Sequence, residues 1–246
     1  MWHDLLLAVG FFTRIPVPDH PNFSQKALKR SALYLPLVGL IVGSLCAVVY
    51  LVAVQLWSPT IAVLLSMITS LLITGGFHED GLADTADGLG GAFERDKKLA
   101  IMTDSRLGSY GSLAMWSALT LKAVLLIELI PQASVLALIL VHGLSRWGAM
   151  LAMVRLPYVR LGESKSKPVV QQLRKPRWLF SGLVCLPLLL WVPLTVAGLL
   201  LITLLTTTLI WHQILKQQIH GYTGDTLGAS QQLNELMLYL AWLAVL

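Results

Sequence analysis

Long apolar runs separated by short polar segments dominate the chain. Residues 31–78 form a stretch of 48 without a single Asp, Glu, Lys or Arg. One helix of that length would extend about 72 Å, more than twice the roughly 30 Å thickness of a bilayer's hydrocarbon core. The run must therefore fold back. Ser58 and Pro59 mark the turn, because Ser caps a helix N-terminus and Pro suits its first turn. The pattern predicts spans at about 35–56 and 60–76.

The remaining apolar runs predict further spans. The charge-free run 178–215 is again too long for one crossing, and we place its break near Pro193. Two more spans are expected at about 110–130 and 133–154, and a last one at about 229–246. The expected fold is therefore an all-α polytopic membrane bundle with about seven transmembrane helices, within a range of about six to eight.

Composition supports a membrane protein. Hydrophobic residues make up 56% of the chain and charged residues 13%, and the mean hydropathy is +0.71. Soluble domains carry roughly 25% charged residues, so a water-soluble enzyme or a disordered chain fits poorly. The net charge is +5, and the basic residues cluster in a few loops between apolar runs. This distribution favours a membrane surface or a phosphorylated ligand over nucleic acid as the partner.

The basic residues also predict an orientation. They lie before the first span, between the second and third, and between the fourth and fifth, whereas the intervening turns carry no Lys or Arg. The positive-inside bias assigns the basic side to the cytoplasm. We therefore expect one integral-membrane domain over 1–246, in the inner membrane, with cytoplasmic active-site loops at about 77–109, 155–177 and 217–228.

An acidic cluster follows the second span. Seven of the 13 acidic residues fall between 79 and 104. Asp80, Asp84 and Asp87 are spaced i, i+4, i+7, which puts their carboxylates on one face of a helix. Like charges at that spacing need a compensating cation, and carboxylate oxygens suit Mg²⁺ or Mn²⁺. A solvated acidic face is the alternative, but the interleaved Gly, Ala and Leu favour a metal site.

The residues beside this triad are less specific. His78 is a candidate metal ligand or general base, and the alternative is an interfacial histidine with a local hydrogen bond. Glu79 points about 100° away from Asp80 on a helix, so we leave it outside the triad.

Two polar segments precede later spans. Asp104 and Arg106 lie in a Gly/Ser-containing turn where they could hold a phosphate; the alternative is helix capping by Asp104 or Ser109. Asp225 and Thr226 could cap the final helix, or supply a metal or phosphate contact.

Two basic residues lie inside predicted spans. Lys122 and Arg146 are expected to be functional, because ionisable groups within a membrane are rare. A phosphate-binding cavity open to the cytoplasm would explain both, and an interhelical ion pair is the alternative. Glu128 is not i+4 from Lys122, so these two need not neutralise each other.

The polar segments carry a family resemblance. GGFHEDGLADTADG at 75–88, DSRLGSYG at 104–111 and GDTLGA at 224–229 resemble the cobalamin 5'-phosphate synthase family, also called adenosylcobinamide-GDP ribazoletransferases. FFTRIPVP at 11–18 resembles the family's opening, and the likeness extends over nearly the whole chain in length, order and hydropathy.

The resemblance implies a polytopic inner-membrane enzyme of cobalamin synthesis. Such an enzyme joins adenosylcobinamide-GDP to α-ribazole or α-ribazole 5'-phosphate, releases GMP and uses Mg²⁺. A homo-oligomer, or an assembly with other cobalamin-synthesis enzymes, is left open. Combining both arguments, we predict catalytic roles for His78, Asp80, Asp84 and Arg106, substrate binding by Asp104, Arg106, Lys122, Arg146, Asp225 and Thr226, and metal binding by Asp80, Asp84 and Asp87.

Two alternative functions are weighed against this prediction. The segment from Asp84 to Gly88 echoes part of the signature of CDP-alcohol phosphotransferases of lipid synthesis, but the rest of that signature is absent in register. A small cation transporter could also place acids, Lys122 and Arg146 around a polar cavity. Its acids are expected near the membrane midplane, whereas these lie at a span's cytoplasmic edge.

Overall fold

A computed structural model describes residues 2–129, 131–159 and 173–246, and only the backbone of 131–134. The protein is all-α, as predicted, and its described residues form no strand, only an isolated bridge between Tyr158 and Tyr222. The helices, in chain order, are α1 (Trp2–Phe12), α2 (Gln25–Ser31), η1 (Ala32–Tyr34), α3 (Leu35–Ala53), α4 (Pro59–Thr74), α5 (Phe77–Gly91), α6 (Arg95–Ile101), α7 (Ser109–Glu128), α8 (Pro131–Ala149), α9 (Ala152–Arg155), α10 (Lys175–Gly182), η2 (Leu183–Cys185), α11 (Leu186–Leu189), α12 (Leu194–Gln218) and α13 (Gly224–Leu243).

The long helices coincide with the predicted apolar runs. Ser58 caps α4 and Pro59 begins it, and Pro193 caps α12, so both predicted breaks are present. The predicted number of spans is not confirmed. Among the described residues, four helical segments are long and apolar enough to cross a membrane, or five if the bent pair α4–α5 counts as one.

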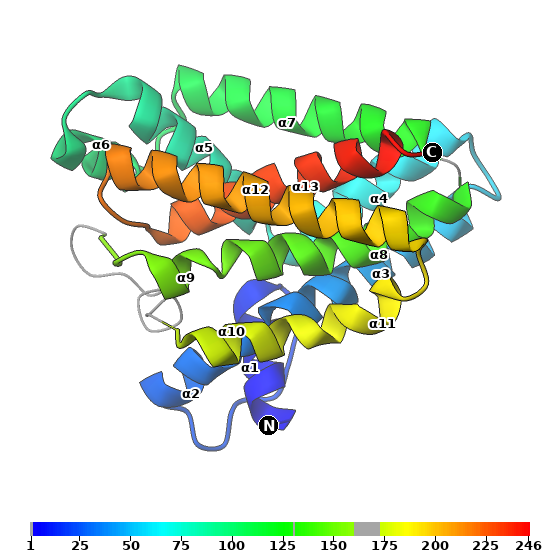
Figure 1. Ribbon diagram of the computed structural model, residues 1–246, viewed down its shortest axis with the longest axis horizontal. Helices are drawn as coiled ribbons and strands as arrows, with labels where there is room; N and C mark the ends of the chain where they lie inside the picture. The colour runs from blue at the N-terminus through cyan, green and yellow to red at the C-terminus, as the bar shows by residue number, and fades with distance from the viewer. Residues whose placement is uncertain (1, 130, 160–172) are drawn as a thin grey trace.

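The last predicted span, 229–246, falls largely within α13, a central helix of the bundle. Figure 1 shows α13 enclosed among α7, α8 and α12, and it also packs on α5. Twelve of its 20 residues are buried, including Gln231, Gln232, Asn234 and Glu235. These polar residues keep α13 outside the set of segments apolar enough to cross a membrane.

A two-glycine hinge redirects the chain into the acidic helix. Gly75 and Gly76 both adopt the left-handed conformation with φ of 69°, which glycine tolerates without a Cβ clash. The hinge bends α5 by 84° from α4. It therefore lays the acidic residues across the end of the bundle rather than continuing them along the axis of α4.

Three segments far apart in sequence meet at this end. Arg95 Nε donates to the Ile219 carbonyl at 3.0 Å, and the Tyr222 N–H donates to the Pro157 carbonyl at 2.9 Å. The described parts of 77–109, 155–177 and 217–228 therefore lie together, on the left of Figure 1. Residues 160–172 of the middle segment lie outside the described residues. The turns near 55 and 193 lie at the opposite end, with the C-terminus (Figure 1).

This arrangement predicts which positions share a side of the membrane. Ser105, Gln217 and Gln55 are exposed, the first two at the end with α5 and the third at the other end. Single Cys substitutions at Ser105 and Gln217 should react alike with a membrane-impermeant thiol reagent in sealed cells, and Gln55→Cys should show the opposite accessibility. The native Cys46 and Cys185 are buried and provide a low background. Opposite labelling of Ser105→Cys and Gln217→Cys would contradict this arrangement.

Candidate active site

The three predicted metal ligands all lie on α5, but their environments differ. Asp80 is exposed, Asp84 is half-buried and Asp87 is buried. The Asp87 carboxylate accepts hydrogen bonds from the Gly108 N–H at 2.7 Å and the Gly111 N–H at 2.8 Å. Asp87 therefore supplies acceptors for backbone N–H groups at the start of α7, which have no partner within the helix. The helix dipole also favours a negative charge at this position.

The glycines of the second polar segment are explained by this contact. A Cβ on Gly108 or Gly111 would collide with the Asp87 carboxylate. Only glycine at both positions lets the backbone N–H groups approach so closely. Part of the DSRLGSYG segment therefore serves to dock α7 on α5 through Asp87.

Asp80 and Asp84 remain as the carboxylates nearer solvent. Among the described residues, no group of three or more His, Cys, Asp or Glu side chains is arranged to hold a metal by itself. Mg²⁺, however, is commonly bound by one or two carboxylates together with substrate phosphates. The pair on α5 fits a metal that arrives with a phosphate-bearing substrate.

The backbone of Asp225 touches the helix turn that carries this pair, through a close crossing of α5 and α13. A Cβ on Gly81 would lie 2.7 Å from the Asp225 carbonyl oxygen and 3.2 Å from the Gly228 Cα. The small residues let α5 and the first turn of α13 touch backbone to backbone. The crossing brings the half-buried Asp225 beside the turn that carries Asp80 and Asp84.

The N-terminus of α13 is capped by a residue that sequence reasoning missed. Thr223 accepts a hydrogen bond from the Thr226 N–H at 3.2 Å, and the Thr226 hydroxyl accepts one from the Thr223 N–H at 2.9 Å, which forms a capping box. Thr226 is buried and its hydroxyl is used in this box, whereas Asp225 accepts from the Thr223 hydroxyl at 3.3 Å. The signal in the sequence for this capping box was Thr223 followed three positions later by another hydroxyl residue, Thr226.

Asp104 and Arg106 pair with each other in the turn between α6 and α7. Arg106 Nη2 donates to Asp104 Oδ2 at 2.6 Å, and its side chain is 87% exposed. Hydrogen bonding from Arg106 lowers the pKa of Asp104 below its usual value. Arg106 lies two residues before Gly108, whose N–H donates to the Asp87 carboxylate. This hydrogen bond connects the Asp104–Arg106 turn to the acidic helix α5.

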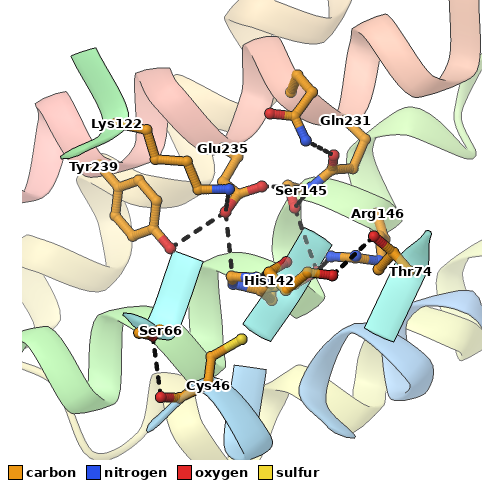
Figure 2. Close-up of polar contacts among 12 residues, drawn as sticks. Cys46, Ser66, Thr74, Lys122, His142, Ser145, Arg146, Gln231, Glu235 and Tyr239 are labelled. Carbon is orange, nitrogen blue, oxygen red and sulfur yellow. Dashed lines mark hydrogen bonds and ion pairs between the residues drawn. The ribbon is translucent and has the colours of Figure 1, made fainter. Parts of the chain in front are cut away.

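Lys122 lies deeper, in an ion pair with a carboxylate that the sequence analysis did not single out. Its Nζ is 2.7 Å from Glu235 Oε1, and both side chains are buried (Figure 2). Glu235 also accepts hydrogen bonds from Gln231 at 2.6 Å and Tyr239 at 3.4 Å. An acid inside an apolar run was the signal for Glu235, but the run was interpreted as a simple span.

A polar chain connects this ion pair to α5. The Gln232 amide donates to Glu79 Oε1 at 3.0 Å and to Gln231 Oε1 at 2.8 Å. Glu79 is buried, and its second carboxylate oxygen has no hydrogen-bond partner among the described residues. Glu79 therefore points to α13, consistent with its exclusion from the acidic triad.

His78 and Arg146 come together in a pocket beside the crossing of α5 and α13. Both are buried and line one pocket with Gln231 and Gly224. Lys122 is not among the residues that line it. The structure therefore divides the predicted site residues among several places: the α5–α13 crossing, the start of α7 with the preceding Asp104–Arg106 turn, the pocket, and the buried network around Lys122.

Comparison with known proteins identifies the family. The sequence profile of the cobalamin-5-phosphate synthase family matches residues 4–243. An adenosylcobinamide-GDP ribazoletransferase from Shewanella amazonensis is 48% identical over 97% of this chain and 94% of its own length. One from Vibrio cholerae is 44% identical over 98% of this chain and 93% of its own, and one from Ralstonia pickettii 41% over 99% and 97%. No solved structure was found to match. The resemblance noted in the sequence is confirmed, and the chain belongs to the cobalamin-5-phosphate synthase family.

Proposed function

We infer that this protein is an adenosylcobinamide-GDP ribazoletransferase that acts in nucleotide-loop assembly of cobalamin. The match to the family over residues 4–243 carries this inference, since relatives of that name align over nearly their full length. The substrates are adenosylcobinamide-GDP and α-ribazole or its 5'-phosphate. The products are adenosylcobalamin or its 5'-phosphate, and GMP.

The reaction is a displacement at phosphorus. A ribose hydroxyl of α-ribazole attacks the cobinamide-side phosphorus of the pyrophosphate and forms a new P–O bond. The P–O bond to the bridging oxygen breaks, the hydroxyl proton is given up, and GMP leaves with the bond's electron pair. The charge on the phosphoryl oxygens must be neutralised throughout, which is the main catalytic task in such transfers.

We assign Mg²⁺ binding to Asp80 and Asp84, with Asp225 in support from α13. Bound Mg²⁺ neutralises phosphate charge and orients the pyrophosphate. Asp80 is exposed at the end where the polar segments meet, and Asp225 lies one helix crossing away. Asp87, predicted as a third ligand, is assigned instead to holding α7 in place, because both its oxygens already accept backbone hydrogen bonds.

Arg106 and His78 are assigned to the substrate. Arg106 is exposed, and its planar fork, now on Asp104, suits a phosphate better than any point charge. His78 lines the pocket two residues before Asp80, which makes it our candidate acceptor of the ribose hydroxyl proton. Lys122 is assigned to support rather than to substrate, because Glu235 neutralises it within the bundle.

We place the site on the cytoplasmic face of the inner membrane. The described parts of the polar segments at the α5 end carry eight of the 18 Lys and Arg residues, whereas the turns near 55 and 193 carry none. The positive-inside bias places such basic loops in the cytoplasm. Substrates that carry phosphate and nucleotide groups would then reach the site from the aqueous side.

The first test is release of GMP by the purified, detergent-solubilised protein. GMP should form from adenosylcobinamide-GDP only when α-ribazole or its phosphate is present, and addition of EDTA should abolish release until excess Mg²⁺ restores it. Asp80→Asn and Asp84→Asn should each lower kcat by about 10²-fold or more, because a preorganised electrostatic contact is lost. A CDP-alcohol donor serves as the control and should give no product. Near-normal turnover by both variants would exclude this metal site.

Asp87→Asn should behave differently from those two variants. The substituted amide presents an NH₂ group to a backbone N–H of α7, which leaves a buried donor unpaired and should cost about 1–3 kcal/mol of unfolding free energy. Thermal unfolding in detergent measures the effect, with Asp80→Asn as the exposed control of the same chemistry. If the Asp87→Asn protein were as stable as wild type but inactive, Asp87 would have to be counted as a metal ligand, as the sequence predicts.

Arg106→Lys should separate charge from geometry. The substitution keeps the positive charge but removes the fork of donors, so KM for adenosylcobinamide-GDP should rise about 10-fold or more at an unchanged melting temperature. Lys97→Arg, at another exposed basic position near this end, is the matched control and should leave KM unchanged. A KM for Arg106→Lys within twofold of wild type would show that Arg106 does not bind phosphate.

A further inference from the structure

A narrow pocket lies between α1, α5, α8 and α13, next to the proposed catalytic residues. Its walls are mainly apolar and include Phe11, Phe12 and Phe77 from the first two of these helices and Met150 just beyond α8. Its polar side chains are His78, Arg146 and Gln231. An apolar pocket with a few polar groups at fixed positions is the usual form of a small-molecule site.

Arg146 is a donor in this pocket with unused capacity. It is only 2% exposed, and its Nη1 donates to the His142 carbonyl of its own helix at 2.9 Å. Its Nε has no hydrogen-bond partner among the described residues. Gln231, by contrast, donates to Ser145 and Glu235 and accepts from Gln232. A buried N–H without an acceptor is costly, so a ligand acceptor beside Arg146 would be stabilising.

The pocket and its donor together define the ligand's chemistry. A phosphate would bring several acceptor oxygens and a double charge into a mainly aromatic and aliphatic cavity. A flat, apolar ring with one acceptor nitrogen matches it better. Resting on the proposed function, we propose that this pocket binds the benzimidazole ring of α-ribazole, and that Arg146 Nε–H donates to the ring nitrogen that is not bonded to ribose.

The position of the pocket agrees with this assignment. His78 lines it from the α5 turn that also carries Asp80, and Gly224 lines it directly before Asp225. A base bound there would hold its ribose close to the crossing of α5 and α13. The hydroxyl nucleophile would therefore be presented beside the carboxylates that we assign to the metal.

The pocket must widen to admit the ring. Its free volume is only about 30 Å³. Phe11 and Phe12 belong to α1, which lies at the periphery of the bundle (Figure 1) and is tied to α2 by the ion pair of Asp4 with Arg30 at 2.9 Å. Displacement of these two phenyl rings, rather than of the bundle helices, provides the space.

The test compares two acceptors on the wild-type protein. One is α-ribazole, and the other is the same riboside with an indole base, in which a C–H replaces the free ring nitrogen. GMP release gives kcat/KM for each. We expect a preference for α-ribazole of about 10-fold or more, since one hydrogen bond to a charged donor is lost in the analogue. Equal kcat/KM values would overturn the proposal while leaving the proposed function intact, and no turnover with either acceptor would refute that function itself.

Two variants then test whether this pocket produces the preference for α-ribazole over the indole riboside. Arg146→Met should abolish it, so that the two acceptors become equivalent, whereas the exposed Arg155→Met at the same end should retain it. Met150→Ala enlarges the pocket and should raise the relative kcat/KM of a riboside with an additional fused benzene ring. The test with Met150→Ala remains valid even if the Arg146→Met protein does not fold. An unchanged preference in Arg146→Met, or unchanged size selectivity in Met150→Ala, would place the base elsewhere.

Discussion

The carboxylate of Glu235 lies in the interior of the bundle, where an unpaired charge would be prohibitively costly. Lys122 on α7 neutralises it at 2.7 Å, and Gln231 and Tyr239 supply further hydrogen bonds. Removing one partner of such a buried pair typically costs about 3–5 kcal/mol. This pair permits a helix as polar as α13 to occupy the centre, and α13 in turn packs on α5, α7 and α8, which carry most of the proposed site.

The polar central helix α13 also makes a chain of contacts that reaches the residues assigned to catalysis. Gln232 on α13 holds Glu79 of α5, and the α5–α13 crossing at Gly81 lets Asp225 lie beside the acidic turn. Asp87 then fixes the start of α7. Because α5, α7 and α13 are mutually locked, the carboxylates assigned to the metal stand on rigid helices, which suits a reaction that depends on preorganised electrostatics.

The same architecture separates two recognition tasks. In the proposed function, phosphate groups would meet the exposed side chains of Asp80 and Arg106, where water and cations are available. The mainly apolar pocket that Arg146 lines is bounded on one side by Phe11 and Phe12 of α1. A transferase that must bring together a highly charged donor and a largely apolar base can in this way provide each with a matching environment.

The sequence by itself determined the helical class, the breaks at Ser58 and Pro193, the family, and the gathering of polar residues in three segments. These follow from local signals: hydrophobic runs, helix caps and long motifs. It could not decide that Asp87 holds the start of α7, that Lys122 pairs with Glu235, or that α13 lies at the centre of the bundle. Those outcomes depend on which helices touch, and partners more than 20 residues apart leave no periodic trace in the chain. Only tertiary packing determines where a buried charge finds its counter-charge.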